Sequence, residues 1–205
     1  MSGSVMLLNE DLSALKPQAM NCARRLADWI VNTQTKDEDC VADSGNFPFI
    51  VSKDGVPRAA NNWNHAFAIM GLLAAGQVFG EERYTHAAVR MGRYLGTLQI
   101  FDPFHRKHYG AFREMTAQTP WCYVRDALSA AWAMAELYRC TGKAEYLERA
   151  KLWEEWFQRE GMDETGWPWW GDEVLHVIVS WIGEHFFGGS NLYHTPVTQD
   201  ANVSA

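Results

Sequence analysis

The chain has 205 residues, of which 47% are hydrophobic, and a formal net charge of −7. This length and composition predict a single domain over residues 1–205 with a sizeable core. The acidic balance argues against a nucleic-acid partner, whose phosphates need a basic surface. No apolar run approaches the about 18 residues of a membrane span, and the start lacks signal-peptide features, so a cytoplasmic protein without a membrane partner is expected.

Six helices are predicted, and two kinds alternate along the chain. Three are amphipathic, with a polar face for solvent: residues 17–35, 82–99 and 144–159. Three are apolar nearly all round and must be buried on most sides: residues 65–79, 126–140 and 172–187. The order is therefore outer, inner, outer, inner, outer, inner. Residues 188–205 have no helical period, and we expect them to be poorly ordered.

An internal repeat links the two central pairs of helices. Gly80, Tyr84 and Ala88 recur as Gly142, Tyr146 and Ala150, each 62 positions later. An ungapped offset across two helices and the turn between them indicates a repeat array of helical hairpins.

Loop lengths also alternate, with consequences for where a site can lie. The turns from inner to outer helices are predicted to have three or four residues. The connections from outer to inner helices are long, over about 36–62, 100–123 and 160–172. The first is predicted to contain either a small hairpin or an irregular arm around Lys53-Asp54-Gly55. Since neighbouring helices are antiparallel, every long loop is expected at the end where the inner helices start, which is where function usually sits.

A second recurring pattern carries a family resemblance. A Trp or Tyr followed by Leu, Ile or Phe, then a glutamine, then a glycine with an aromatic residue one or two positions later occur around Gln34 and Gly45, around Gln99 and Gly110, and around Gln158 and Gly166. Together with the helix alternation, this resembles the α/α toroids of the six-hairpin glycosidase type, over residues 17–187. That resemblance implies an all-α fold in which inner helices ring a central cavity and outer helices enclose them.

Within that class, the sequence is similar to unsaturated glucuronyl and rhamnogalacturonyl hydrolases, which place two aspartates near the starts of inner helices. Asp126 occupies one such start, whereas Asn64 stands at the other. A full toroid has five to seven helix pairs, and this chain supplies about three. Three arrangements follow: a longer polypeptide contains the rest, two chains close the ring as a homodimer, or the arc is open.

Candidate catalytic residues lie at the predicted starts of the inner helices. Asp126 is either a first-turn charge that complements the helix dipole or a general acid with a raised pKa. Since glycosidic cleavage usually needs two carboxyl groups, Asp172 or Glu173 is its expected partner, although both also fit a helix cap. Glu114 is a third carboxylate on the same rim, or a solvated loop residue.

The other expected binding residues are polar or aromatic and lie at the same end. Asn64 and His65 open an inner helix, where His65 is either a core residue or a substrate contact. Arg113 or Arg125 would bind a substrate carboxylate in bidentate fashion. Flat apolar rings suit the faces of sugar rings, although any one of them is as readily a packing residue: Trp63, Phe112, Trp121, Trp167 and Trp170.

These observations predict a carbohydrate-active enzyme, a glycoside hydrolase acting on an oligosaccharide that can carry a uronate. The alternatives are a non-catalytic module that binds glycan or protein, a sugar epimerase or polysaccharide lyase, and, third, a terpene-cyclase-like protein, for which no Asp-rich motif is found. The spacing of the cysteines and histidines indicates no metal site, and no cofactor is expected.

Overall fold

The computed structural model describes residues 16–38, 43–51, 57–102, 106–115, 121–162, 166 and 171–173. Five α-helices lie in this part of the chain: α2 (Lys16–Thr33), α3 (Asn62–Phe79), α4 (Glu82–Thr97), α5 (Val124–Thr141) and α6 (Ala144–Glu160). The loops contain the 3-10 helix η2 (Arg106–His108) and the strands β1 (Pro48–Val51), β2 (Pro57–Ala60), β3 (Trp121–Tyr123) and β4 (Gly171–Glu173). The predicted helix over 172–187 lies outside the described residues except for Asp172 and Glu173, and the tail over 188–205 lies wholly outside them.

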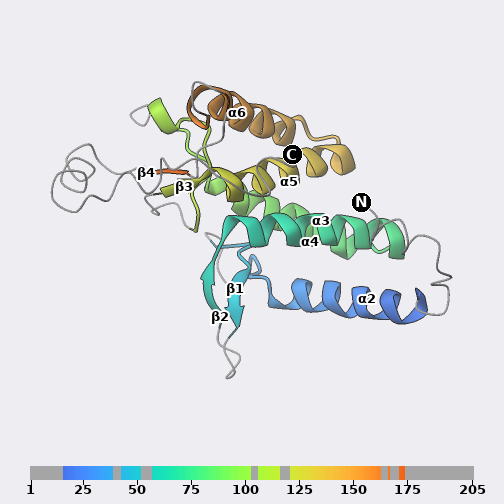
Figure 1. Cartoon of the computed structure of the whole chain (residues 1–205). Helices are drawn as coiled ribbons and strands as arrows, with labels where there is room; N and C mark the ends of the chain where they lie inside the picture. The colour runs from blue at the N-terminus through green and yellow to red at the C-terminus, as the bar shows by residue number, and fades with distance from the viewer. Residues whose placement is uncertain are drawn as a thin grey trace, which may run out of the picture.

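The helices form two layers of an arc (Figure 1). The apolar helices α3 and α5 pack side by side, while α4 packs on α3, α6 packs on α5, and α2 lies against α3 and α4. The core between the layers is rich in alanine and aliphatic residues from both inner helices, with Tyr84, Met91 and Trp156 contributed by the outer ones. The prediction of an all-α, partial α/α toroid with inner and outer helices is confirmed.

Each helical hairpin closes through a glycine in the left-handed conformation. Gly80 ends α3 with φ 68°, and Gly142 ends α5 with φ 70°. Each donates its backbone N–H to a carbonyl four residues earlier, at Gly76 and Tyr138, which closes the helix end. The turns contain two residues rather than the predicted three or four, because this cap reverses the chain within a shorter length.

All four strands lie at one end of the arc, where α3 and α5 begin (Figure 1). β1 and β2 form an antiparallel hairpin before α3, the first of the two predicted alternatives, and its turn lies outside the described residues. β3 leads directly into α5 and pairs antiparallel with β4. The prediction that the long connections gather at the starts of the inner helices is therefore confirmed for the described loops.

β4 corrects one prediction. Asp172 and Glu173 were expected to open a third inner helix, but they lie in a strand, with Asp172 opposite Cys122 and Glu173 opposite Trp121. The Gly-Asp step that resembles a helix cap is compatible with extended backbone as well, and the ladder to β3 selects that alternative.

The recurring glutamine and glycine attach each loop to the next outer helix. Gln34 Nε2 donates to the Ala87 carbonyl at 2.9 Å, and Gln99 Nε2 donates to the Arg149 carbonyl at 2.9 Å, so the acceptors are again 62 residues apart. Gly45 and Gly110, with φ 91° and 99°, lie so close to the carbonyls of Arg90 and Leu152 that a Cβ would overlap them. We call this paired contact the Gln–Gly lock.

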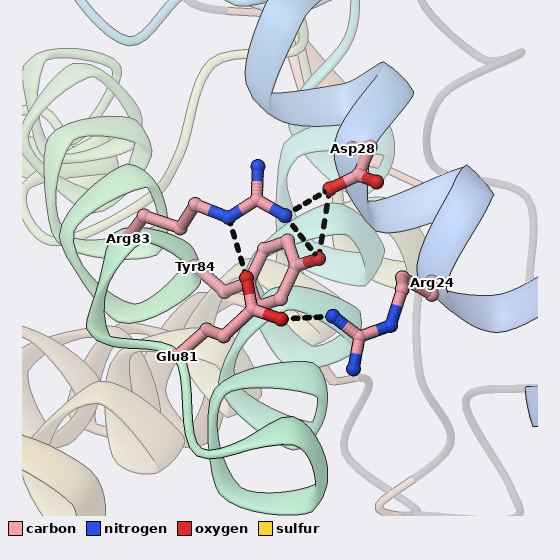
Figure 2. A network of polar contacts seen from close by, with 5 residues as sticks. All are labelled: Arg24, Asp28, Glu81, Arg83 and Tyr84. Carbon is pink, nitrogen blue, oxygen red and sulfur yellow. Dashed lines mark hydrogen bonds and ion pairs between the residues drawn. The ribbon is translucent and has the colours of Figure 1, made fainter.

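A polar network fastens α2 to the turn between α3 and α4 (Figure 2). Glu81 accepts from Arg24 and from Arg83 Nε, the latter at 2.7 Å, while Asp28 Oδ1 accepts from Arg83 Nη2 at 2.6 Å and from the Tyr84 hydroxyl at 2.8 Å. The pKa of Glu81 is lowered chiefly by the hydrogen bond from Arg83. These groups join elements far apart in the sequence, at the end of α3 opposite the strands.

Candidate active site

The loop between α4 and β3 is tied to the start of α3. Asn61 caps this helix, because its side-chain oxygen accepts from the Trp63 backbone N–H at 3.0 Å. Its Nδ2 donates to a Glu114 carboxylate oxygen. Asn62 adds two bonds, from its backbone N–H to the Glu114 carbonyl at 2.7 Å and from Nδ2 to the Arg113 carbonyl at 3.2 Å. The predicted residues Arg113 and Glu114 are thus joined to two asparagines that lie more than 50 positions earlier in the chain and were not predicted.

Two carboxyl groups are buried at this end of the arc. Glu114 is 3% exposed and Asp126 is 6% exposed. Asp126 lies in the first turn of α5, where its backbone carbonyl accepts from the Ser129 hydroxyl at 2.6 Å. A solvated loop residue was one interpretation of Glu114, and its burial excludes that interpretation. Asp126 therefore fits a first-turn charge that complements the helix dipole as well as a general acid.

Two amide oxygens at the start of α3 have no hydrogen-bond donor among the described residues. They are Asn62 Oδ1, on a side chain with no exposed surface, and Asn64 Oδ1, on a partly buried one. A buried acceptor without a donor is costly, by about 1–3 kcal/mol. Both atoms are therefore suited to accept a hydrogen bond from a water molecule or from a hydroxyl group of a ligand.

His65 is fully buried and uses both ring nitrogens inside the protein. Nδ1–H donates to the Asn61 carbonyl at 2.7 Å, and Nε2 accepts from the Phe47 backbone N–H at 2.9 Å. The ring also stacks on Tyr94, with centroids 4.9 Å apart. Burial lowers the pKa of His65 to about 4, so the imidazole is neutral near pH 7. Of the two interpretations of this residue, the structure supports the core one.

The aromatic residues of the predicted sugar-binding rim divide into two groups. Phe112 has no exposed surface and packs in the core, with its backbone bridged to Gln99, so it presents no face for stacking. Trp63 is partly exposed and contacts the exposed ring of Phe67 edge-on, with centroids 6.1 Å apart. Trp63 therefore keeps an accessible position.

The remaining predicted residues are placed by their backbone or not at all. Trp121 lies in β3, Arg125 in the first turn of α5, and Asp172 and Glu173 in β4, opposite the segment that leads into Asp126. Their side chains, like all of Trp167 and Trp170, lie outside what the structure describes.

Two residues of the site were not singled out from the sequence: Asn61 and Asn62. The Asn-Asn pair directly before an apolar helix is a cap signal that could have been used to find both.

The described residues contain no group of three His, Cys, Asp or Glu side chains that could hold a metal ion. None of the helices in the described part of the chain is long and apolar enough to cross a membrane.

The two-layered arc of inner and outer helices defines the fold of the chain as a partial α/α toroid. It is similar in structure to a sugar epimerase from a ruminal bacterium, at a TM-score of 0.61 and 15% identity over 76% of this chain and 40% of that one. It is also similar to the cellobiose 2-epimerase of Bacillus thermoamylovorans, at a TM-score of 0.62 and 16% identity over 77% of this chain and 42% of that one. The cellobiose 2-epimerase of Spirochaeta thermophila is similar at a TM-score of 0.59 and 18% identity, over 78% of this chain and 41% of that one.

At these identities the likeness shows the fold. The chain spans 40–42% of the length of these enzymes. No protein-family model matches the sequence, and no curated protein is significantly similar to it. The narrower resemblance to glucuronyl and rhamnogalacturonyl hydrolases stays a prediction.

Proposed function

We propose that this chain forms part of a carbohydrate-processing site, and that the reaction is sugar epimerisation by acid–base catalysis. The observation that carries the proposal is the pair of buried carboxyl groups, Asp126 and Glu114, at the end of the arc where the inner helices start. The three structural neighbours described above are sugar epimerases by name, which favours this chemistry over hydrolysis.

Epimerisation next to a carbonyl needs a base that removes a proton from carbon and an acid that returns one to the opposite face. In the proposed site Asp126 and Glu114 fill these two roles. Asn62 Oδ1 and Asn64 Oδ1 accept hydrogen bonds from sugar hydroxyls, and Trp63 packs against the apolar face of a sugar ring. Arg113, whose backbone is held at the start of α3, supplies the guanidinium for a substrate that carries a carboxylate.

Hydrolysis is the second candidate, because a glycosidase also requires two carboxyl groups, one as acid and one as base or nucleophile. The two reactions differ in their products. Epimerisation gives an isomer of unchanged mass, whereas hydrolysis gives smaller sugars. For hydrolysis, Asp172 and Glu173 are the partners of Asp126 to test, because β4 pairs with the strand that leads into α5.

The test is incubation of the protein with two panels, reducing disaccharides and unsaturated uronate oligosaccharides, followed by NMR and mass analysis of the products. We expect Asp126→Asn and Glu114→Gln each to lower kcat/KM by about 100-fold or more, the size typical for loss of a general acid or base. The matched control is Glu155→Gln, which removes an exposed carboxylate on α6 and should leave turnover unchanged.

Asp126→Asn should keep the free energy of unfolding within about 1 kcal/mol of the parent, since a first-turn charge at a helix N-terminus is worth about 0.3–1 kcal/mol. Full activity in both carboxylate variants would refute the proposed roles. Sugar that raises Tm without any turnover would show a binding module in place of an enzyme.

A further inference from the structure

One face of α2 is exposed although the same face of α4 is buried. Aligning Gln34 with Gln99 relates α2 to α4 by 65 positions. On α4, the side chains of this face are inaccessible to solvent: Tyr84, Ala87, Ala88 and Met91. Their equivalents on α2 are all exposed: Ala19, Cys22, Ala23 and Leu26. Leu26 is 55% exposed, whereas Met91 is 0% exposed.

The contacts of α4 show what normally covers this face. Tyr84 packs against Phe79 of α3, with ring centroids 6.1 Å apart, so α4 turns the face toward the inner helix that precedes it. On α6 the equivalents Tyr146 and Trp153 are buried in the same way, next to α5. By this repeat, α2 presents a face shaped for an inner helix in front of it, and no described inner helix lies there.

The exposed side of α3 indicates that an inner helix packs at the same position. Phe67 and Val78, on one face of α3, are 56% and 61% exposed, and Gly71 between them is exposed too. On α5 the equivalents of Phe67 and Gly71 are Ser129 and Ala133, both buried. A single inner helix placed before α2 would cover both the α2 face and this flank of α3.

The opposite edge of the arc is exposed in a complementary way. Trp132 of α5 is 57% exposed, whereas its equivalent on α3, Met70, packs partly buried against the core. Gly166 has the positive φ of Gly45 and Gly110, but no outer helix among the described residues lies within 4 Å of the position its Cβ would take. In the last described unit, the glycine of the Gln–Gly lock is therefore present, but no described outer helix packs against it.

We propose that a second copy of this chain covers these surfaces, head to tail, and that two copies close one toroid. The stretch over residues 174–187, which the sequence predicts as an inner helix, follows β4, and β4 pairs with the strand that leads into α5. It would extend the inner layer past Trp132 and pack against α2 and α3 of the other copy.

Residues 1–15 do not match an inner helix of this kind. Inner helices here are apolar along their length, whereas residues 1–15 contain Asn9, Glu10 and Asp11 in their middle. Three predicted inner and three predicted outer helices per chain give six pairs in the closed dimer. Two copies also supply most of the length of the neighbours, each of which one chain matches over 40–42%.

The experiment is light scattering on the purified full chain across a wide concentration range. We expect a particle of twice the 23.3 kDa chain mass. Leu26→Asp on α2 and Val78→Asp on α3 should each halve the particle mass, because both place a charge on the covered flank. The control is Tyr109→Asp, which charges an exposed ring in the loop before β3 and should leave the dimer intact.

Cys22 provides a readout that does not depend on a variant folding. It lies on the exposed face of α2, so alkylation should be slow at concentrations that favour the dimer and at least about tenfold faster on dilution. A monomer at every concentration would overturn the proposal. A dimer that survives Leu26→Asp and Val78→Asp with Cys22 still reactive would overturn it too, and neither result depends on the proposed enzymatic activity.

Discussion

His65 shows how one buried imidazole can connect a loop to the helix that carries the candidate site. Its two nitrogens join the Asn61 carbonyl, next to the cap of α3, to the Phe47 backbone in the preceding loop. Removal of this ring would release the loop from the helix start, where Asn62 and Glu114 also meet. At the residue scale, the site is therefore held by neutral hydrogen bonds inside the core as well as by the residues proposed to bind sugar.

This residue makes stability depend on pH. The pKa of His65 is about 4 in the folded protein against an ordinary value of 6.5, so the unfolded chain binds more protons between these pH values. Stability is therefore full above pH 6.5 and falls as the pH drops toward 4. We expect a loss of about 2 kcal/mol between pH 8 and pH 5, at about 1.4 kcal/mol per pKa unit, measured by urea unfolding.

His65→Gln should remove this pH dependence while lowering stability at pH 8. His86→Gln, a change of an exposed histidine on α4, should leave the pH dependence in place. A parent protein equally stable at pH 8 and pH 5 would show that His65 is not buried in neutral form.

At the scale of elements, what repeats is the contact between a loop and the next outer helix as well as the helices themselves. The Gln–Gly lock occurs twice with acceptors 62 residues apart, and in both cases a loop glycine lies directly against the backbone of the next outer helix. This contact explains why the sequence repeats a glycine at these positions. A side chain would push the loop off the helix, and the loop in turn positions Arg113 and Glu114.

Gly110→Ala tests this contact. The added Cβ would lie 2.5 Å from the Leu152 carbonyl oxygen, at a backbone φ of 99°. We expect a loss of about 3 kcal/mol in the free energy of unfolding, from left-handed strain together with overpacking against backbone. Gly142→Ala is the matched control, because its φ is 70° but the space around it is open, so only the strain of about 1–2 kcal/mol applies.

Chemical denaturation of the two variants side by side measures the difference. Equal losses in Gly110→Ala and Gly142→Ala would mean that the loop can move away from α6 at no cost. The loop would then not depend on the lock for its position.

At the scale of the whole molecule, the described part of the arc has two unlike edges, and at each edge no described helix takes the place of the neighbour found in the other repeats. If two copies close the ring, unfolding is coupled to dissociation. Tm should then rise with protein concentration, since a hundredfold increase is worth about 2.7 kcal/mol by mass action. Scanning calorimetry over that range should show a shift of a few degrees, and a Tm independent of concentration would contradict a dimer.

Periodicity in the sequence determined the helices, their alternation and the end of the molecule that collects the long loops. These features depend on local spacing of apolar residues and on the antiparallel packing of helices of similar length, both of which can be read along the chain. The Gly80 and Gly142 turns belong to the same group. The recurring glutamine and glycine are also visible in the sequence, although their contacts with the outer helices are not.

Only the tertiary structure decided which polar residues meet. The bonds of Asn61 and Asn62 to the Arg113–Glu114 segment span more than 50 residues, and the burial of His65 and Phe112 depends on loops from different repeats. Asp172 and Glu173 lie in a strand because of a ladder to a segment about 50 residues earlier. Such contacts depend on how repeats pack in space, and local pattern carries no information about them.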